Sequence, residues 1–172
     1  SISDANFESA DMPRCVWADT SLVNSRFSGV NLSSNCFAVT EDAQTDGTVN
    51  IENNDFSHSR IEKSSFQNMV VPKTNFHGAT VINCNFNGAD LSASDLSQAD
   101  MQQCQFRKAK LTGANLKESN FDQAFFSKAH LVSADLSGSN FYGVDFLGIT
   151  VGEPKFDGCN RDATIMKDWR PG

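Results

Sequence analysis

Large apolar residues recur at every fifth position along most of this chain. From residue 84 the sequence divides into CNFNG, ADLSA, SDLSQ, ADMQQ, CQFRK and further pentapeptides with a large apolar centre. Leu, Ile, Val, Met, Phe or Trp occupies all 30 such centres, and 13 of the 14 Phe residues stand there. The position two before the centre is Ala, Ser, Thr, Cys or Val in 24 of the 29 pentapeptides after the first. A short fixed period of this regularity is typical of a solenoid.

A period of five matches neither the 3.6-residue helix nor the two-residue strand. The centre and the residue two before it must both face the interior, and a chain that turns one corner per pentapeptide meets this condition. Four corners close a square coil of 20 residues, whose stacked turns pair as parallel strands about 4.8 Å apart. The 30 centres therefore predict an all-β fold with four pentapeptides per coil and about 7.5 coils.

Three stretches show the repeat in its plainest form: Ala89-Asp90-Leu91, Ala114-Asn115-Leu116 and Ala134-Asp135-Leu136 fit the pattern A-[DN]-L-x-x. On these residues the chain resembles the pentapeptide repeat family, over residues 1–158. The resemblance implies a right-handed quadrilateral β-helix. It is specific for the fold and nearly uninformative about activity, because a fold by itself does not determine a function.

One interruption of the period separates Phe37 from Ile51, which are 14 residues apart. Two registers are possible. In the first, residues 38–50 continue the repeat over three faces, with one residue fewer than the period requires. In the second, the looped register, Phe37 and Ile51 belong to adjacent pentapeptides and nine extra residues form a loop between them. The first register would place acidic residues such as Asp42 near core positions, where burial is costly. We therefore prefer the looped register, with the excursion at residues 40–48, whose sequence TEDAQTDGT has a turn-forming composition.

The looped register predicts a continuous aromatic column on one face of the coil. Its members, 20 residues apart except across the excursion, are Trp17, Phe37, Phe66, Phe86, Phe106, Phe126 and Phe146. In the register with one residue deleted, the column would instead stop at Phe66.

The repeat pattern weakens near the C-terminus, where Pro154 occupies a position otherwise held by small residues. The expected repeat region therefore ends at residue 158. Solenoid ends need a cap, and residues 159–172 are expected to supply one. Asp162 is a suitable N-cap residue for a short helix, and either a short helix or a turn is expected to lie over the last coil.

The chain of 172 residues has 14 Lys+Arg and 21 Asp+Glu, a net charge of -7. A phosphate-backbone binder needs the opposite balance, so direct nucleic-acid binding is not expected. No run approaches the roughly 18 apolar residues of a membrane span, so no membrane partner is expected either. Residues 1–60 hold nine acidic and three basic residues. This acidic excess is either a solvated surface or a patch for a basic partner, with candidate residues Glu41, Asp42, Asp46, Glu52 and Glu62.

Basic residues gather further along the chain. Lys108 and Lys128 are one coil apart and stack on one face, as do Lys110 and His130. Like charges stacked about 5 Å apart cost a little stability unless counter-charges lie between them, so the stack is either a partner-binding surface or an ordinary solvated one. The candidate partner-binding residues in this region, including two outward aromatic side chains, are Arg107, Lys108, Lys128, Phe125 and Tyr142.

No motif in the sequence supplies a catalytic, metal-binding or cofactor-binding site, and none is expected. Asp or Asn directly before a centre fits the repeat pattern and is expected to satisfy corner backbone groups, rather than to form an acid–base pair. His58, His77 and His130 lie in different columns, so neither a metal cluster nor a nucleophile–His pair is expected. Glycine-rich phosphate loops are absent from the sequence.

The five cysteines have no zinc-ligand spacing. Cys84 and Cys104 occupy inward positions one coil apart, where a disulfide is geometrically possible, but the simpler interpretation is two small buried residues. An odd count favours a reducing, cytoplasmic compartment. Because Ser1 lies within a pentapeptide, we expect a trimmed or processed chain, and an exported or lumenal location stays open.

Two functional hypotheses follow. The preferred one is a non-enzymatic protein-binding module or rigid scaffold that presents flat faces to a protein partner, as a monomer or an end-to-end dimer. The alternative, implied by the resemblance, is a DNA-mimicking, topoisomerase (gyrase)-binding protein of the quinolone-resistance type. The chain has the acidity and the loop of such proteins, but its charge is modest and concentrated at one end.

Overall fold

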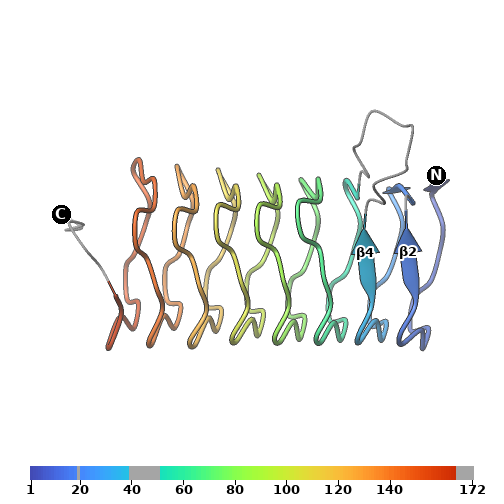
Figure 1. Ribbon diagram of the computed structural model, residues 1–172, viewed down its shortest axis with the longest axis horizontal. Coiled ribbons are helices and arrows are strands. Elements are labelled where there is room, and N and C mark those ends of the chain that lie inside the picture. The colour runs from blue at the N-terminus through green and yellow to red at the C-terminus, as the bar shows by residue number, and fades with distance from the viewer. Residues whose placement is uncertain (19, 39–50, 166–172) are drawn as a thin grey trace.

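The computed structural model describes residues 1–18, 20–38 and 51–165. They wind into one row of stacked coils that forms a rod, with the N-terminus at one end (Figure 1). Within these residues there are strands, isolated bridges and turns but no helix. The described part thus also lacks any helix suited to crossing a bilayer.

Short parallel strands begin the rod. The four strands are β1 (Ile2–Ser3), β2 (Val16–Ala18), β3 (Leu22–Val23) and β4 (Cys36–Ala38). Strand β1 pairs with β3 so that Ile2 lies opposite Leu22, and β2 pairs with β4 so that Trp17 lies opposite Phe37. Both pairs are offset by one 20-residue coil, which is the repeat length that the sequence predicts.

Beyond β4 the ladder continues as isolated parallel bridges between residues in stacked coils. Asn85 bridges Gln105, for example. The N–H of Phe86 donates to the Gln105 carbonyl at 2.7 Å, and the N–H of Gln105 donates to the Cys84 carbonyl at 2.9 Å. Each pentapeptide is thereby hydrogen-bonded to the equivalent pentapeptide of the next coil, so the backbone groups of the walls are satisfied between coils.

Each coil has four faces, numbered here in chain order. Faces 1, 2, 3 and 4 contain the pentapeptides centred on Ile2, Phe7, Met12 and Trp17, respectively, and those that stack on them. The central residues from Leu22 to Phe146 are buried. These residues form one continuous hydrophobic cluster inside the described coils.

The aromatic column on face 4 is unbroken. Its ring centroids are 4.6–5.8 Å apart, in the pairs Trp17–Phe37, Phe37–Phe66, Phe66–Phe86, Phe86–Phe106, Phe106–Phe126 and Phe126–Phe146. Cys36 bridges Ser65, an offset of 29 residues. That offset is one coil of 20 plus nine inserted residues, so the chain adopts the looped register. The excursion itself, at residues 40–48, lies outside the described residues.

A second stack of rings changes face along the rod. Near the N-terminus it lies on face 2 and consists of Phe7, Phe27, Phe56 and Phe76. Towards the C-terminus it lies on face 3, where Phe121 stacks on Phe141 at 5.2 Å. In both segments the rings meet face 4 edge-on, as between Phe121 and Phe126. Edge-to-face contact is favourable because the positive ring edge faces a negative ring face.

The small inward residues two positions before a centre fit the narrow interior, and those that are Ser, Thr or Cys also make hydrogen bonds. The N–H of Cys84 donates to the Cys104 sulfur at 3.3 Å, and the Cys104 thiol donates to the Val81 carbonyl at 2.7 Å. On face 3 the Ser119 hydroxyl donates to the Leu96 carbonyl at 2.6 Å. Cys84 and Cys104 are free thiols, and burial raises the pKa of Cys104 well above its ordinary value. Size alone therefore does not account for Ser and Cys at these positions.

The corner of each pentapeptide adopts a left-handed backbone conformation. All described residues with positive φ, 21 non-glycine and eight glycine, stand two positions after a centre or its equivalent. This conformation costs roughly 1–2 kcal/mol in an L-residue. The corner geometry is therefore imposed by the closed coil, and glycine is the residue that adopts it with the least strain.

The coil extends past the boundary expected at residue 158. Asn160 bridges Asn140, and Ile165 bridges Asp145. Asp162 lies in a repeat turn, where its N–H donates to the Asn160 side chain at 3.1 Å. Of the two expected forms, a turn and not a helix therefore stands at Asp162, because the turn and the backbone ladder of the repeat continue even without a large apolar centre. The rest of the expected cap, residues 166–172, lies outside the described part.

Candidate protein-binding surfaces

The Asp and Asn residues before each centre complete the corner turns. The Asp90 carboxylate accepts the Ser92 N–H at 3.1 Å, and the Asp135 carboxylate accepts the Ser137 N–H at 3.2 Å. Burial by itself raises the pKa of both carboxyls, but hydrogen bonds from Ser92 and Ser137 and nearby lysines outweigh it and lower both. The expected corner role is confirmed, and a lowered pKa suits a structural carboxylate rather than a general acid.

The candidate acidic patch is not one surface in the described residues. Glu52 lies on face 1, 3.7 Å from the Lys73 ammonium, and Glu62 lies on the opposite face 3, 2.9 Å from the Arg60 guanidinium. The other three candidates, Glu41, Asp42 and Asp46, lie outside the described residues. The two described acids thus point to opposite sides of the rod, and each is paired with a base.

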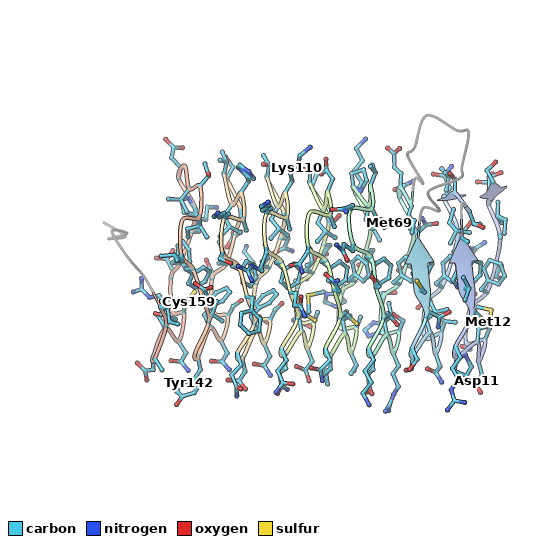
Figure 2. The ribbon with its side chains drawn as sticks, in the orientation of Figure 1. Asp11, Met12, Met69, Lys110, Tyr142 and Cys159 are labelled. Atoms are coloured by element: carbon cyan, nitrogen blue, oxygen red, sulfur yellow. The ribbon has the colours of Figure 1, made fainter. Side chains whose placement is uncertain are left out.

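The basic stack stands at the corner between faces 4 and 1. Lys110 pairs with Asp90 at 3.4 Å, and its side chain projects from the edge of the rod in Figure 2. Within the part of the chain that the structure describes, no acidic side chain lies within ion-pair distance of Arg107, Lys108 or Lys128.

Three exposed apolar side chains gather on face 4 beside these cations. Phe125 is 45% exposed, Leu147 44% and Ile165 58%. Phe125 and Ile165 both bridge Asp145 from opposite sides, and Leu147 follows Asp145 by two residues. The Lys128 N–H donates to the Leu147 carbonyl at 2.9 Å, which places the cationic residue next to the apolar ones. We call Phe125, Leu147 and Ile165 the face 4 patch.

Sequence reasoning found this surface only in part. The sequence pattern indicates Phe125 as a candidate but places Ile165 in the C-terminal cap. Ile165 is 20 residues, or one coil, after Asp145, and this spacing is the signal that would have placed it on face 4. Tyr142 is exposed at 47% but stands on face 3, around the corner from the patch, and projects from the edge of the rod near its C-terminal end (Figure 2). The candidate aromatic residues therefore occupy two faces.

Two histidines that the sequence kept apart are in contact. His58 and His77 lie on face 2 with ring centroids 5.6 Å apart and ring planes at 84°. The expectation that separate columns keep them apart is wrong. His77 follows its centre by one residue and His58 follows its centre by two, and these two positions are neighbours on stacked coils. A separation of 19 residues was the signal. The described residues nonetheless hold no group of three or more His, Cys, Asp or Glu suited to a metal ion.

Family comparison agrees with this architecture. A model described as a pentapeptide repeat region matches residues 79–156, and a model of eight pentapeptide repeat copies matches residues 1–34. Together the two matches span more than half of the chain. The chain belongs to the pentapeptide repeat family. A search of curated proteins finds no significant match.

Solved pentapeptide repeat proteins share the fold of this one. A pentapeptide repeat protein from the thylakoid lumen of Arabidopsis thaliana is 28% identical, with a TM-score of 0.54. That alignment covers 55% of this chain and 66% of the other, so this chain spans a little under two thirds of its length. Pentapeptide repeat proteins of known structure are right-handed quadrilateral β-helices, and the expected fold class is confirmed.

Two further solved structures align over nearly the whole chain but weakly. QnrB1, a plasmid-mediated fluoroquinolone resistance protein, is 15% identical with a TM-score of 0.45, over 91% of this chain and 86% of QnrB1. HetL, involved in heterocyst differentiation regulation in the cyanobacterium Nostoc sp. strain PCC 7120, is 14% identical with a TM-score of 0.27, over 98% of this chain and 92% of HetL. At these scores neither likeness carries an argument about the function of this pentapeptide repeat protein.

Proposed function

We propose that this pentapeptide repeat protein is a non-enzymatic protein-binding module that engages an acidic protein partner through face 4. The observation that carries the proposal is the face 4 patch, in which Phe125, Leu147 and Ile165 are exposed together on consecutive coils. Single exposed apolar residues are common on protein surfaces, but contiguous ones mark interaction sites.

The chemistry of the patch matches that of protein interfaces. Aromatic side chains and arginine are enriched where binding energy concentrates, and Phe125 stands one coil above the segment that contains Arg107 and Lys108. The backbone beneath the patch is held by the hydrogen-bonded ladder between coils. A rigid surface loses little conformational entropy on binding, so more of the contact energy remains as affinity.

The cations beside the patch favour an acidic partner, and the Asp145 carboxylate that lies between Phe125 and Ile165 accepts the Leu147 N–H at 2.9 Å. Arg107, Lys108 and Lys128 have no acidic neighbour within ion-pair distance among the described residues. An acidic partner would supply the missing counter-charges and would be steered to the surface at low ionic strength. Added salt should therefore slow association more than it weakens the apolar contacts.

Affinity capture with matched variants tests the proposal. Phe125→Ser removes the one aromatic residue of the patch, and Val16→Ser removes an apolar residue that is 72% exposed at the other end of face 4. The unmodified protein and Val16→Ser should retain the same acidic protein from an extract of the native host, and Phe125→Ser should lose it. If all three proteins capture it equally, face 4 is not the binding surface.

The DNA-mimic alternative is tested separately. A DNA mimic needs a continuous acidic surface, whereas the described acids Glu52 and Glu62 are paired with bases on opposite faces. We therefore expect no protection of gyrase from a quinolone in a supercoiling assay. Clear protection by the purified chain, lost when Glu41, Asp42 and Asp46 are changed to the matching amides, would favour the DNA mimic over the face 4 module.

A further inference from the structure

We propose that His58 and His77 form a binding site for a divalent transition-metal ion on face 2. Their ring centroids are 5.6 Å apart. Two imidazoles that share one tetrahedral ion, with bonds of about 2.0–2.1 Å, have ring centres roughly 5 Å apart. With His77 kept on Ser97, rotation of the exposed His58 side chain would bring one nitrogen of each ring to a common ion.

Ser97 prepares His77 for this role. The Nδ1 atom of His77 is 2.9 Å from the Ser97 hydroxyl oxygen. Ser97 is itself buried, and its N–H donates to the Asp95 carboxylate at 2.9 Å, which holds the residue in place. When Nδ1–H donates to this oxygen, the Nε2 atom of His77 has the free lone pair that a metal ion needs. Metal-binding histidines are typically oriented by such a second hydrogen bond.

Gly78 makes room for the other ring. A Cβ atom at position 78 would lie only 2.7 Å from Nδ1 of His58 and 2.9 Å from its Cε1. The imidazole of His58 therefore occupies space that any other residue at this position would contest. Its Nδ1–Cε1 edge faces Gly78.

The Asp residues before two centres of this face each use one carboxylate oxygen, Oδ1, in hydrogen bonds to the corner and to the next coil. Asp55 accepts the Ser57 N–H and the Asn75 amide, each at 3.0 Å. Asp95 likewise accepts the Ser97 N–H and the Asn115 amide. Among the described residues no carboxylate lies within ion-pair distance of His58 or His77, so the site offers two imidazoles, and water or a partner group would complete the coordination. Imidazole ligands suit Zn²⁺, Ni²⁺ and Cu²⁺, whereas Mg²⁺ and Ca²⁺ prefer oxygen.

Titration of the full chain with Zn²⁺, followed by the NMR signals of the histidine rings, tests the site. The signals of His58 and His77 should shift together along one saturating curve with one ion per chain, and the signal of His130 should stay in place. Mg²⁺ at the same concentration should shift none of them.

Variants separate a built site from general imidazole binding. His58→Gln and His77→Gln should each abolish the curve, and Ser97→Ala should weaken binding about tenfold by releasing the His77 ring. His130→Gln and Cys36→Ser, which alter exposed metal-binding side chains elsewhere, should leave it unchanged. Circular dichroism checks that each variant is folded. His58→Gln is the substitution least able to disturb the fold, because His58 is exposed. Saturable binding that survives His58→Gln in the folded protein would overturn the proposal.

Discussion

At the residue scale, the same few hydrogen bonds and backbone conformations recur at the corners of the coil. The residue before the centre hydrogen-bonds the N–H two positions on, as Asp90 does with Ser92. The residue two after the centre adopts positive φ, as Ala93 does at 56°. Where the small inward residue has a hydroxyl or thiol, this group can donate to a carbonyl of the neighbouring coil, as Ser119 does to Leu96. These roles are set by position in the repeat rather than by the identity of any one residue.

Ala93→Gly should stabilise the fold. The left-handed conformation of Ala93 costs roughly 1–2 kcal/mol, and glycine avoids this strain at a cost of roughly 0.5–1 kcal/mol in chain entropy. We expect a net gain of about 0.5–1 kcal/mol in the free energy of unfolding, measured by urea denaturation. Ala114→Gly, at a buried position that lacks positive φ, should instead lose about 1 kcal/mol. Losses in both variants would contradict the corner argument.

Phe106→Ala should be among the most damaging single changes. Phe106 is buried in the middle of the aromatic column, so truncation should cost about 3–5 kcal/mol. Phe125→Ala, at a partly exposed outward position, should cost less than about 1 kcal/mol. Urea melts of the two variants measure the difference, and equal losses would mean that Phe106 does not support the core.

The stability should fall in acid partly through Asp135. The folded pKa of this carboxyl is lowered, against the effect of burial, by hydrogen bonds from Ser137 and by Lys117, whose ammonium lies 3.1 Å away. A lowered folded pKa stabilises the fold above the unfolded pKa, and this contribution is lost as the pH falls through the folded pKa. Asp135→Asn retains an acceptor for Ser137, as Asn115 shows for Lys117 in the same column, but cannot titrate. Melts across the acid range should show a shallower pH dependence in this variant, and an unchanged slope would exclude Asp135 as a contributor.

At the element scale, the unit of this fold is the coil rather than the strand. The longest strands contain three residues, and most of the ladder consists of isolated bridges. Each coil contacts only its neighbours, so an insertion between two pentapeptides is tolerated if the coils on either side keep their register. The stacking of Phe37 on Phe66 at 4.6 Å shows that the register is kept across the insertion.

Deleting residues 40–48 should therefore leave a cooperatively folding protein. The deletion restores pentapeptide spacing between Phe37 and Ile51, and it removes no residue that contributes to the described core. We expect a single cooperative transition in thermal melts followed by circular dichroism, with the ring contact between Phe37 and Phe66 retained. A chain that no longer folds would show that the inserted residues are needed for the coils to form.

At the scale of the whole molecule, the rod separates stability from recognition. The inward residues of all four faces form one core, so outward residues can vary along the length without disturbing the fold. The surface consequently differs from place to place: paired acids near the N-terminal end, two histidines on face 2, and cations beside the face 4 patch towards the C-terminal end. A pentapeptide repeat protein can thus present several independent surfaces on one rigid support.

The amino-acid sequence alone determined the period, the four-sided coil, the looped register and the aromatic column that contains Phe86 and Phe106. These features were predictable because a closed square coil has little interior room, and each inward position penalises residues of the wrong size or polarity. Outward positions have no such penalty, so the pattern predicted neighbours 20 residues apart, such as Lys110 and His130, but not contacts between adjacent outward columns. Only the tertiary structure brought His58 against His77 and continued the coil to place Ile165 beside Asp145. Those contacts depend on how stacked coils align their outward columns, which is a property of the three-dimensional ladder rather than of any one pentapeptide.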